Sequence, residues 1–184
     1  TELRAATPEQ AWAAIAGLGL AIDLTLRERQ DALKAKAHPW EIAKGFDGAC
    51  PLSPFVAPDP ALDLAALETR LVVNGRRRQH GSSAQMLTPI IELLCHASRR
   101  FSLWPGDVLL TGTPAGVGPL LPGDRITAEL KGLVLVHARS SRTPFLPASS
   151  SRSAGRCAKM PLVTTPTMLL IAVAVARGSG GAKS

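Results

Sequence analysis

Residues 22–30 read Ile-Asp-Leu-Thr-Leu-Arg-Glu-Arg-Gln, an apolar, strand-like run that leads into a polar turn. If the chain turns helical after Asp23, then Asp23, Arg27 and Gln30 lie on one face, because residues three and four positions apart are neighbours on a helix. A carboxylate, a guanidinium and an amide would then converge, a set that suits a bound cation and an organic carboxylate. The structural alternative is that Asp23 caps the helix and Arg27 is a solvated charge.

Strand and turn signals follow this segment along the chain. Residues 71–73 are apolar and precede the turn dipeptide Asn74-Gly75, which predicts a hairpin that continues into a basic strand. Residues 107–110 predict a short strand, and residues 125–138 alternate like two strands around Lys131-Gly132. These patterns indicate a chain that is mainly β.

Helical patterns are fewer. Residues 8–20 are rich in Ala and carry apolar residues at helical spacing, and residues 88–101 do the same behind Thr88 as N-cap and Pro89 at the first helical position. Residues 30–60 are rich in Pro and Gly, so we expect a long functional loop there. The predicted class is therefore α+β, rich in β-structure, with a few peripheral helices.

The net charge of +7 is unevenly distributed. All 14 acidic residues lie at or before Glu129, whereas six of the 21 basic residues follow Arg139. We therefore expect a nearly neutral domain over residues 1–139 and a basic, Ser/Arg/Pro/Ala-rich tail over residues 140–184, disordered or non-native. The loss of acids motivates the hypothesis that the tail is translated from a shifted reading frame, which sequencing of the coding DNA would test.

Several classes of protein do not fit the sequence. Cys50, Cys95 and Cys157 are far apart and form no CxxC pair, which argues against a disulfide framework or zinc finger and favours a cytoplasmic setting. The longest apolar stretch has nine residues, fewer than a membrane-spanning helix needs. The loop at residues 111–118 matches no phosphate-binding motif, because prolines follow where a helix would begin.

Five segments, taken in order, resemble the conserved segments of the fumarylacetoacetate hydrolase family. They are IDLTLRERQ (22–30), AKGFDGACPLSPFV (43–56), LVVNGRRRQHG (71–81), WPGDVLLTGTPAGVGPL (104–120) and PGDRITAEL (122–130). Within the family, the form TGTPAGVGP (111–119) in the fourth string is most similar to the small acylpyruvate and fumarylpyruvate hydrolases. The resemblance implies a mixed β-sandwich or roll and a metal-dependent hydrolase that cleaves a carbon–carbon bond in acylpyruvates.

The resemblance also implies roles for individual residues. Asp23 falls on a metal-ligating carboxylate, and Arg27 and Gln30 fall on side chains that contact the substrate. Lys44 matches a loop lysine that stabilises the developing enolate, and Thr113 matches a threonine that binds the substrate's carboxylate end. The implied cofactor is Mg²⁺ or Mn²⁺, which would chelate the pyruvoyl group while the ion and Lys44 hold the enolate charge.

The sequence departs from the family pattern upstream of Asp23. The family places a Glu-x-Glu pair of metal ligands about thirty residues before that aspartate, and only Glu2 and Glu9 precede it here. We therefore expect an N-terminally incomplete catalytic domain that binds Mg²⁺ weakly and has little activity, because one carboxylate anchors the ion poorly.

Alternative functions remain open at this point. Within the family they are an oxaloacetate decarboxylase and the isomerase of 2-hydroxyhepta-2,4-diene-1,7-dioate in aromatic compound catabolism, since one stabilised enolate serves all three reactions. Outside it they are a non-catalytic remnant and a basic binding module built on residues 76–78 and His80. We expect a small pyruvoyl substrate, no nucleic acid or membrane partner, and a homodimer by family analogy.

Overall fold

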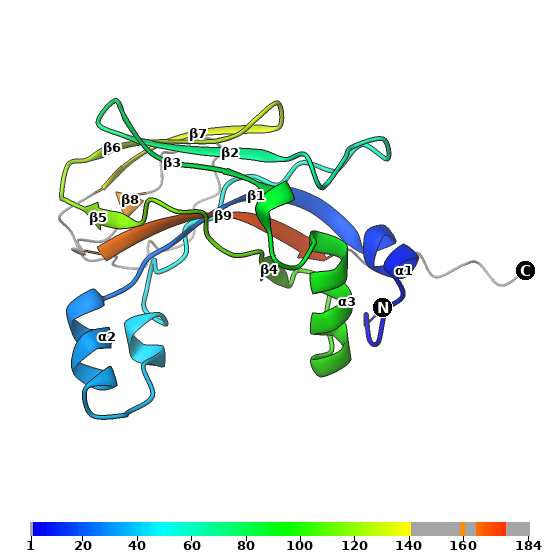
Figure 1. Ribbon diagram of the computed structural model, residues 1–184, viewed down its shortest axis with the longest axis horizontal. Helices are drawn as coiled ribbons and strands as arrows, with labels where there is room; N and C mark the ends of the chain where they lie inside the picture. Colours follow the sequence, from blue (N-terminus) through cyan, green and yellow to red (C-terminus); the bar gives the residue numbers. More distant parts are fainter. Residues whose placement is uncertain (1, 141–158, 161–164, 176–184) are drawn as a thin grey trace, which may run out of the picture.

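The computed structural model describes residues 2–140, 159–160 and 165–175 (Figure 1). Its strands are β1 (Ile15–Asp23), β2 (Glu68–Val73), β3 (Arg76–Ser82), β4 (Val108–Leu110), β5 (Gly118–Leu120), β6 (Arg125–Leu130), β7 (Val134–Ser140), β8 (Lys159–Met160) and β9 (Thr165–Val175). Its helices are α1 (Pro8–Ala13), α2 (Arg27–Lys34) and α3 (Ile90–Arg100), with the 3₁₀ turns η1 (Glu41–Ala43) and η2 (Ser83–Gln85). The β-rich α+β class predicted from the sequence is confirmed.

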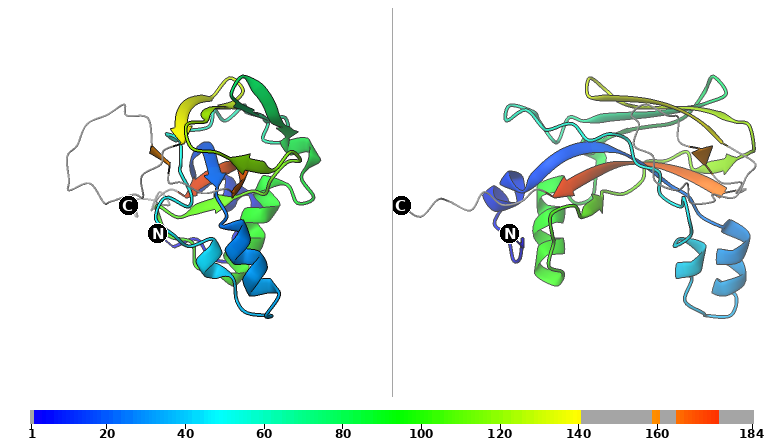
Figure 2. Two further views of the ribbon diagram at one scale, coloured as in Figure 1. Left: turned by 90° about the vertical axis from the view of Figure 1, so that its left-hand side faces the viewer. Right: turned by 180° about the vertical axis from the view of Figure 1, so that it is seen from behind.

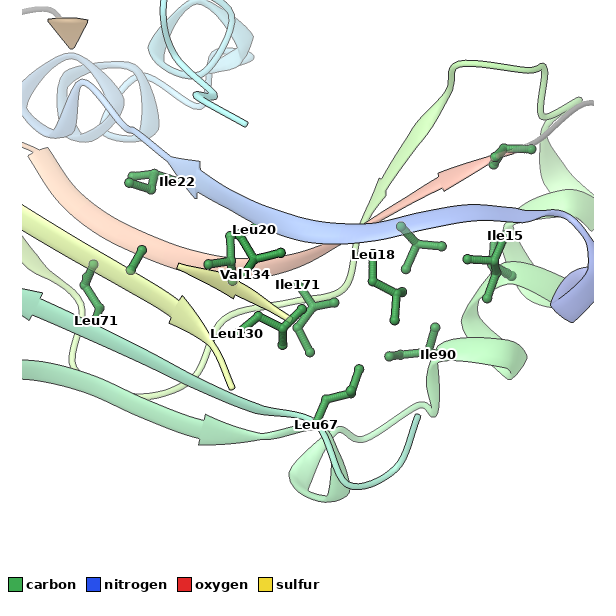
Figure 3. Packing of buried hydrophobic residues seen from close by; sticks show 14 of the residues in the cluster. Ile15, Leu18, Leu20, Ile22, Leu67, Leu71, Ile90, Leu130, Val134 and Ile171 are labelled. Carbon is green, nitrogen blue, oxygen red and sulfur yellow. The ribbon is translucent and has the colours of Figure 1, made fainter. Parts of the chain in front are cut away.

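Two sheets pack face to face. One has the order β1-β9-β4, with β5 also paired to β9, and the other has the order β3-β2-β6-β7-β8. The second sheet covers one face of the first, while α2 and α3 lie toward the other side at opposite ends (Figures 1 and 2). Apolar side chains from both sheets meet between them, as Figure 3 shows for Leu18, Leu20, Leu71 and Leu130. Burial of this shared apolar face is the main force that holds the sheets together.

Strand β1 has a neighbour along each edge. Strand β9 runs antiparallel to it along one edge, and residues 49–56 exchange backbone hydrogen bonds with it along the other. Gly17 is needed where this second neighbour crosses, because a Cβ added there would lie 2.8 Å from the Cβ of Phe55. The helix predicted over residues 8–20 is therefore wrong beyond Ala13, where α1 ends and the strand takes over.

The predicted hairpins are confirmed. Strands β2 and β3 pair antiparallel around Asn74 and Gly75, whose φ values of 51° and 77° suit the tight turns that match strand twist. Strands β6 and β7 pair around Lys131-Gly132, and β4 occupies the short strand predicted at residues 107–110. Local sequence patterns were sufficient to predict all of these elements.

The helices differ from prediction at their starts. Helix α3 begins at Ile90 after Pro89 as N-cap, so Thr88 does not cap it. Helix α2 covers residues 27–34 and thus extends into the loop predicted over residues 30–60. None of the helices in the described ranges is both long and apolar enough to cross a membrane.

Strand β9 is the largest departure from the sequence prediction. Thr165–Val175 lies within the stretch for which we expected disorder, yet it pairs with β1, β4 and β5. The continuous apolar run at residues 168–175 lacks the alternation of a half-exposed strand and suits a strand buried on both faces. The expectation of a disordered tail is corrected for this strand; residues 141–158, 161–164 and 176–184 lie outside the described residues.

The position of β9 makes a prediction about stability. Val173 in β9 is fully buried, whereas Leu135 in β7 is 60% exposed. We expect Val173→Asp to lower the free energy of unfolding by more than about 3 kcal/mol, because it buries an unpaired charge, and Leu135→Asp to change it by no more than about 0.5 kcal/mol. Urea unfolding followed by circular dichroism measures both; equal effects would show that β9 is not part of the sheet.

Candidate functional site

The candidate site lies where β1 ends and the chain turns into α2. Residues 22–26 are tied by backbone hydrogen bonds to a loop that follows α2. Ile22 donates to the carbonyl of Pro51 at 3.0 Å, and Leu24 and Leu26 donate to the carbonyls of Ala49 and Ala43 at 2.8 and 2.9 Å. This ladder fixes the loop against the end of β1 and so decides which loop side chains reach it.

Asp23 and Lys44 form the central contact of the site. The ammonium of Lys44 lies 2.7 Å from a carboxylate oxygen of Asp23, and the two side chains are 28% and 21% exposed. A half-buried pair is screened less than one on the open surface, so its geometry is better defined. The structure thus brings together two predicted residues that lie 21 positions apart in the sequence.

Arg27 and Gln30 form a second contact in the first turn of α2. A guanidinium nitrogen of Arg27 donates to the amide oxygen of Gln30 at 2.6 Å, and Gln30 is buried. Arg27 and Gln30 share one helix face as predicted, since they are three positions apart in a helix that begins at Arg27. Asp23 is the last residue of β1 and not part of this helix, so the predicted helical face that included Asp23 is wrong. The predicted contact of Arg27 and Gln30 with substrate remains a prediction.

Thr113 lies elsewhere. It lines a cavity of about 340 Å³ between the loop after β4 and the segment that leads into α3. The lining side chains are apolar or carry hydroxyl and amide groups: Thr69, Ser82, Ser83, Gln85, Met86, Leu87, Thr88, Leu93, Thr111, Thr113, Pro114 and Ile171, with Gly81 and Gly112. No charged side chain lines this cavity, and neither do the other four predicted residues, Asp23, Arg27, Gln30 and Lys44. The structure therefore does not bring Thr113 into the cluster around Asp23.

The glycine-rich loop that carries Thr113 has a structural role at Gly116. A Cβ on this residue would overlap the carbonyl oxygen of Arg78, and its φ of 98° is unfavourable for other residues. The loop is also tied to β3, because the amide of Gln79 donates to the carbonyl of Pro114 at 3.0 Å. The close packing therefore supports a structural role for Gly116.

Cys50 is a member of the site that the sequence analysis missed. Because Ile22 and Leu24 pair with Pro51 and Ala49, the antiparallel register places Asp23 opposite Cys50, and opposed residues share a face. The thiol retains exposed surface, but partial burial raises its pKa; the charge of Asp23 raises it further and that of Lys44 lowers it. The sequence analysis missed Cys50 because it did not predict the pairing of residues 22–26 with the loop that carries both Lys44 and Cys50.

The described residues do not by themselves form a metal centre. Among them no three His, Cys, Asp or Glu side chains gather around one point. Asp23 is paired with Lys44, whose positive charge opposes a cation at the same oxygen. Asp23 as a metal ligand therefore remains a prediction that needs ligands from outside the described residues.

The triple arginine of β3 is the feature on which the alternative of a basic binding module depends. Arg76, Arg77 and Arg78 are exposed, as expected for a solvated hairpin, and Gln79 is buried and points inward. Beside them, Glu68 pairs with Lys131 at 3.1 Å, and this hydrogen bond lowers the pKa of Glu68. Arg70 and Glu129 form another pair on this sheet, at 3.0 Å.

Comparisons with known proteins point to one family. The profile of the fumarylacetoacetate (FAA) hydrolase C-terminal domain matches residues 1–139. Oxaloacetate tautomerase YcgM of Escherichia coli (strain K12) is 48% identical over 131 residues, 71% of this chain and 60% of that protein.

Comparison with solved structures points to the same family. A structure from Oleispira antarctica that carries the name fumarylacetoacetate isomerase/hydrolase is 52% identical, with a TM-score of 0.71, over 76% of this chain and 65% of that one. Fumarylpyruvate hydrolase from Pseudomonas aeruginosa, in complex with Mn²⁺ and pyruvate, is 30% identical, with a TM-score of 0.71, over 77% of this chain and 60% of that one. The chain thus spans less than two thirds of the length of these relatives.

The position of Cys50 predicts how the thiol reacts. Asp23→Asn removes a negative charge that raises the pKa of Cys50, so we expect alkylation by iodoacetamide to become roughly two- to fivefold faster below the thiol pKa. Lys44→Ala removes a positive charge that lowers the pKa, so alkylation should become slower. Peptide mass spectrometry after timed alkylation measures both rates, with buried Cys95 as the internal control for unfolding. Equal shifts in the two variants would contradict the arrangement.

The positive charge of Lys44 beside Asp23 predicts that this chain binds a divalent metal ion weakly. Titration calorimetry with Mn²⁺ should show no tight, saturable site on this chain, because one carboxylate already paired with Lys44 is a poor anchor for a divalent ion. A single tight site of unit stoichiometry would contradict the expectation.

Proposed function

The chain belongs to the fumarylacetoacetate hydrolase family, and we propose that it acts on oxaloacetate as a keto–enol tautomerase. The single observation that supports this best is the Asp23–Lys44 contact of 2.7 Å at the end of β1, with Arg27 and Gln30 in the adjacent helical turn. Identity of 48% to a bacterial oxaloacetate tautomerase supports the choice of substrate. Because the chain spans 60% of that protein, the activity of the whole is part of the proposal.

Tautomerisation needs a group that stabilises negative charge on oxygen. A proton leaves the carbon next to the ketone to solvent water, which gives an enolate, and solvent water returns a proton to the enolate oxygen, so the keto and enol forms contain the same atoms. A fixed ammonium near that oxygen lowers the barrier, because it faces the place where charge develops. We assign this role to Lys44, whose position Asp23 fixes through their 2.7 Å contact.

The second contact suits the carboxylates of the substrate. A guanidinium can hold a carboxylate through paired N–H groups, and the buried Gln30 limits the directions that Arg27 can take. Arg27 would then orient oxaloacetate while Lys44 stabilises the enolate. No step in this scheme passes through a metal ion, because the described residues do not form a site for one.

Hydrolysis of an acylpyruvate is the second candidate. The likeness to a fumarylpyruvate hydrolase from Pseudomonas aeruginosa, with a TM-score of 0.71, supports it. The same enolate forms when the carbon–carbon bond beside a pyruvoyl group breaks, so the two activities share Lys44. A homodimer with a small pyruvoyl substrate also remains part of the proposal, on family analogy alone.

The role of Lys44 predicts a loss of activity. We expect Lys44→Ala to reduce any enhancement of oxaloacetate tautomerisation by about 10²–10³-fold, as when an oxyanion donor is removed. Lys36→Ala is the matched control, because Lys36 is exposed beyond the end of α2. The ultraviolet absorbance of the enol follows the reaction.

Two results would change the proposal. An unaltered rate in Lys44→Ala would remove Lys44 from the chemistry. Release of pyruvate from acetylpyruvate or fumarylpyruvate, without acceleration of the oxaloacetate enol, would replace tautomerisation by hydrolysis.

A further inference from the structure

The outer face of the five-stranded sheet is open to solvent. Helices α2 and α3 lie toward the far side of the other sheet, and no α-helix of the described ranges lies over this face (Figures 1 and 2). On β2, Leu71 and Val73 are buried in the core. The alternate residues of this strand, Glu68, Arg70 and Val72, therefore point outward. Their charged side chains can meet a ligand from solution.

A β-bulge in β3 brings two cations onto this face. The pairing register shifts between Leu71 and Val72, so that Arg78 is the extra residue on β3. In a regular strand Arg77 and His80 would face opposite sides, because they are three positions apart. Here each lies opposite an outward residue of β2, and opposed residues share a face. The bulge therefore turns Arg77 to the same side as His80.

The bulge is fixed by the loop that follows β4. The carbonyl of Arg78 packs so closely against Gly116 that a Cβ there would overlap its oxygen. The amide of Gln79 donates to the carbonyl of Pro114 at 3.0 Å. Bulges that re-aim a side chain are frequent beside functional sites. The backbone that presents Arg77 is thus held in place by contacts on its other side.

A cavity of about 270 Å³ lies on this face of the sheet. Its lining carries three permanent positive charges against two negative ones, and a protonated His80 adds a fourth positive charge. A hollow with an excess of one sign of charge concentrates ligands of the opposite sign. The lining residues are Glu68, Thr69, Arg70, Arg77, His80, Glu129 and Lys131.

Both acids of the cavity are already paired with cations. Glu129 contacts Arg70 at 3.0 Å. Glu68 contacts Lys131 at 3.1 Å. The first contact engages one nitrogen of Arg70, and a guanidinium has further N–H donors. Arg77 is exposed and forms no ion pair with any residue of the described ranges. An incoming anion can therefore bind Arg77 without breaking an existing pair.

We propose that this cavity binds the phosphate group of a small anion, with Arg77 as its main contact and His80 and Arg70 beside it. A phosphate group presents three oxygens in different directions, which suits cations that converge from two strands, whereas a carboxylate presents two oxygens in one plane. The site shares no residue with the cluster around Asp23 and Lys44, so the inference goes beyond the proposed function and does not rest on it. The group can come from free phosphate or from a phosphate monoester.

The test uses two neighbouring arginines as a matched pair. Arg77→Gln and Arg76→Gln remove the same charge from adjacent exposed positions, and only Arg77 lines the cavity. Inorganic phosphate is titrated into the full chain at constant ionic strength and followed by phosphorus NMR. We expect one saturable site with a Kd of about 1 mM or tighter. Arg77→Gln should weaken binding about tenfold or more and Arg76→Gln less than about twofold, because a hydrogen bond to a charged group is lost only in the first.

Two further titrations define the ligand. Malonate at the same ionic strength should bind at least about fivefold more weakly than phosphate, because it lacks the third oxygen on one centre. Equal affinity for malonate would overturn the assignment to phosphate. Glycerol 3-phosphate should depend on Arg77 as phosphate does; tighter binding than that of phosphate identifies a monoester as the source, and equal binding identifies the phosphate group alone.

Two results would overturn the inference. One is equal weakening by Arg76→Gln and Arg77→Gln, because the anion would then respond only to diffuse charge. The other is the absence of saturable phosphate binding by the unsubstituted chain. Melting curves by circular dichroism verify that the variants are folded, and His80→Ala, also at an exposed position, should independently weaken binding about threefold.

Discussion

The ladder between residues 22–26 and the loop at residues 43–51 is the constraint on which the site depends. Three backbone hydrogen bonds of 2.8 to 3.0 Å hold the loop there, and each comes from an even-numbered residue of the run. The even-numbered Ile22 and Leu24 also belong to the core, so the same alternation that fills the core leaves Asp23 facing the site. The alternation of side chains along residues 22–26 thus determines both which of them fill the core and which of them face the site.

That ladder in turn depends on the pairing of β1 with β9. Strands β4 and β5 each pair with β9, so it is the centre of its sheet. The family profile ends at residue 139, yet the sheet that supports the site is completed by Thr165–Val175. Unpaired strand edges are unstable and prone to association, and a strand without charged residues is well suited to fill the gap. The support of the site therefore includes sequence outside the family match.

Sequence reasoning succeeded where structure is local. Asn74-Gly75 specifies its own turn, and Arg27 and Gln30 are neighbours through helical spacing alone. Sequence reasoning failed where contacts between segments far apart in the sequence determine the local structure. Strand β1 replaces the end of a predicted helix because it pairs with β9 and with residues 49–56, and no local pattern records those contacts. Lys44 was placed in the site only by family resemblance, and Cys50 was missed because the ladder that aligns it with Asp23 joins segments far apart in sequence.

The charge balance of the site decides which ligands it favours. Arg27 and Lys44 exceed Asp23 by one positive charge, and the uncapped start of α2 adds partial positive charge. At 4 Å and an effective dielectric constant of about 20, two unit charges interact by about 4 kcal/mol, so a divalent cation beside Lys44 meets substantial repulsion. Further carboxylates would have to reverse that balance before a metal could bind. On the residues described, the charge balance at the end of β1 favours an anionic ligand over a cation, which supports the proposed stabilisation of an enolate by the ammonium of Lys44.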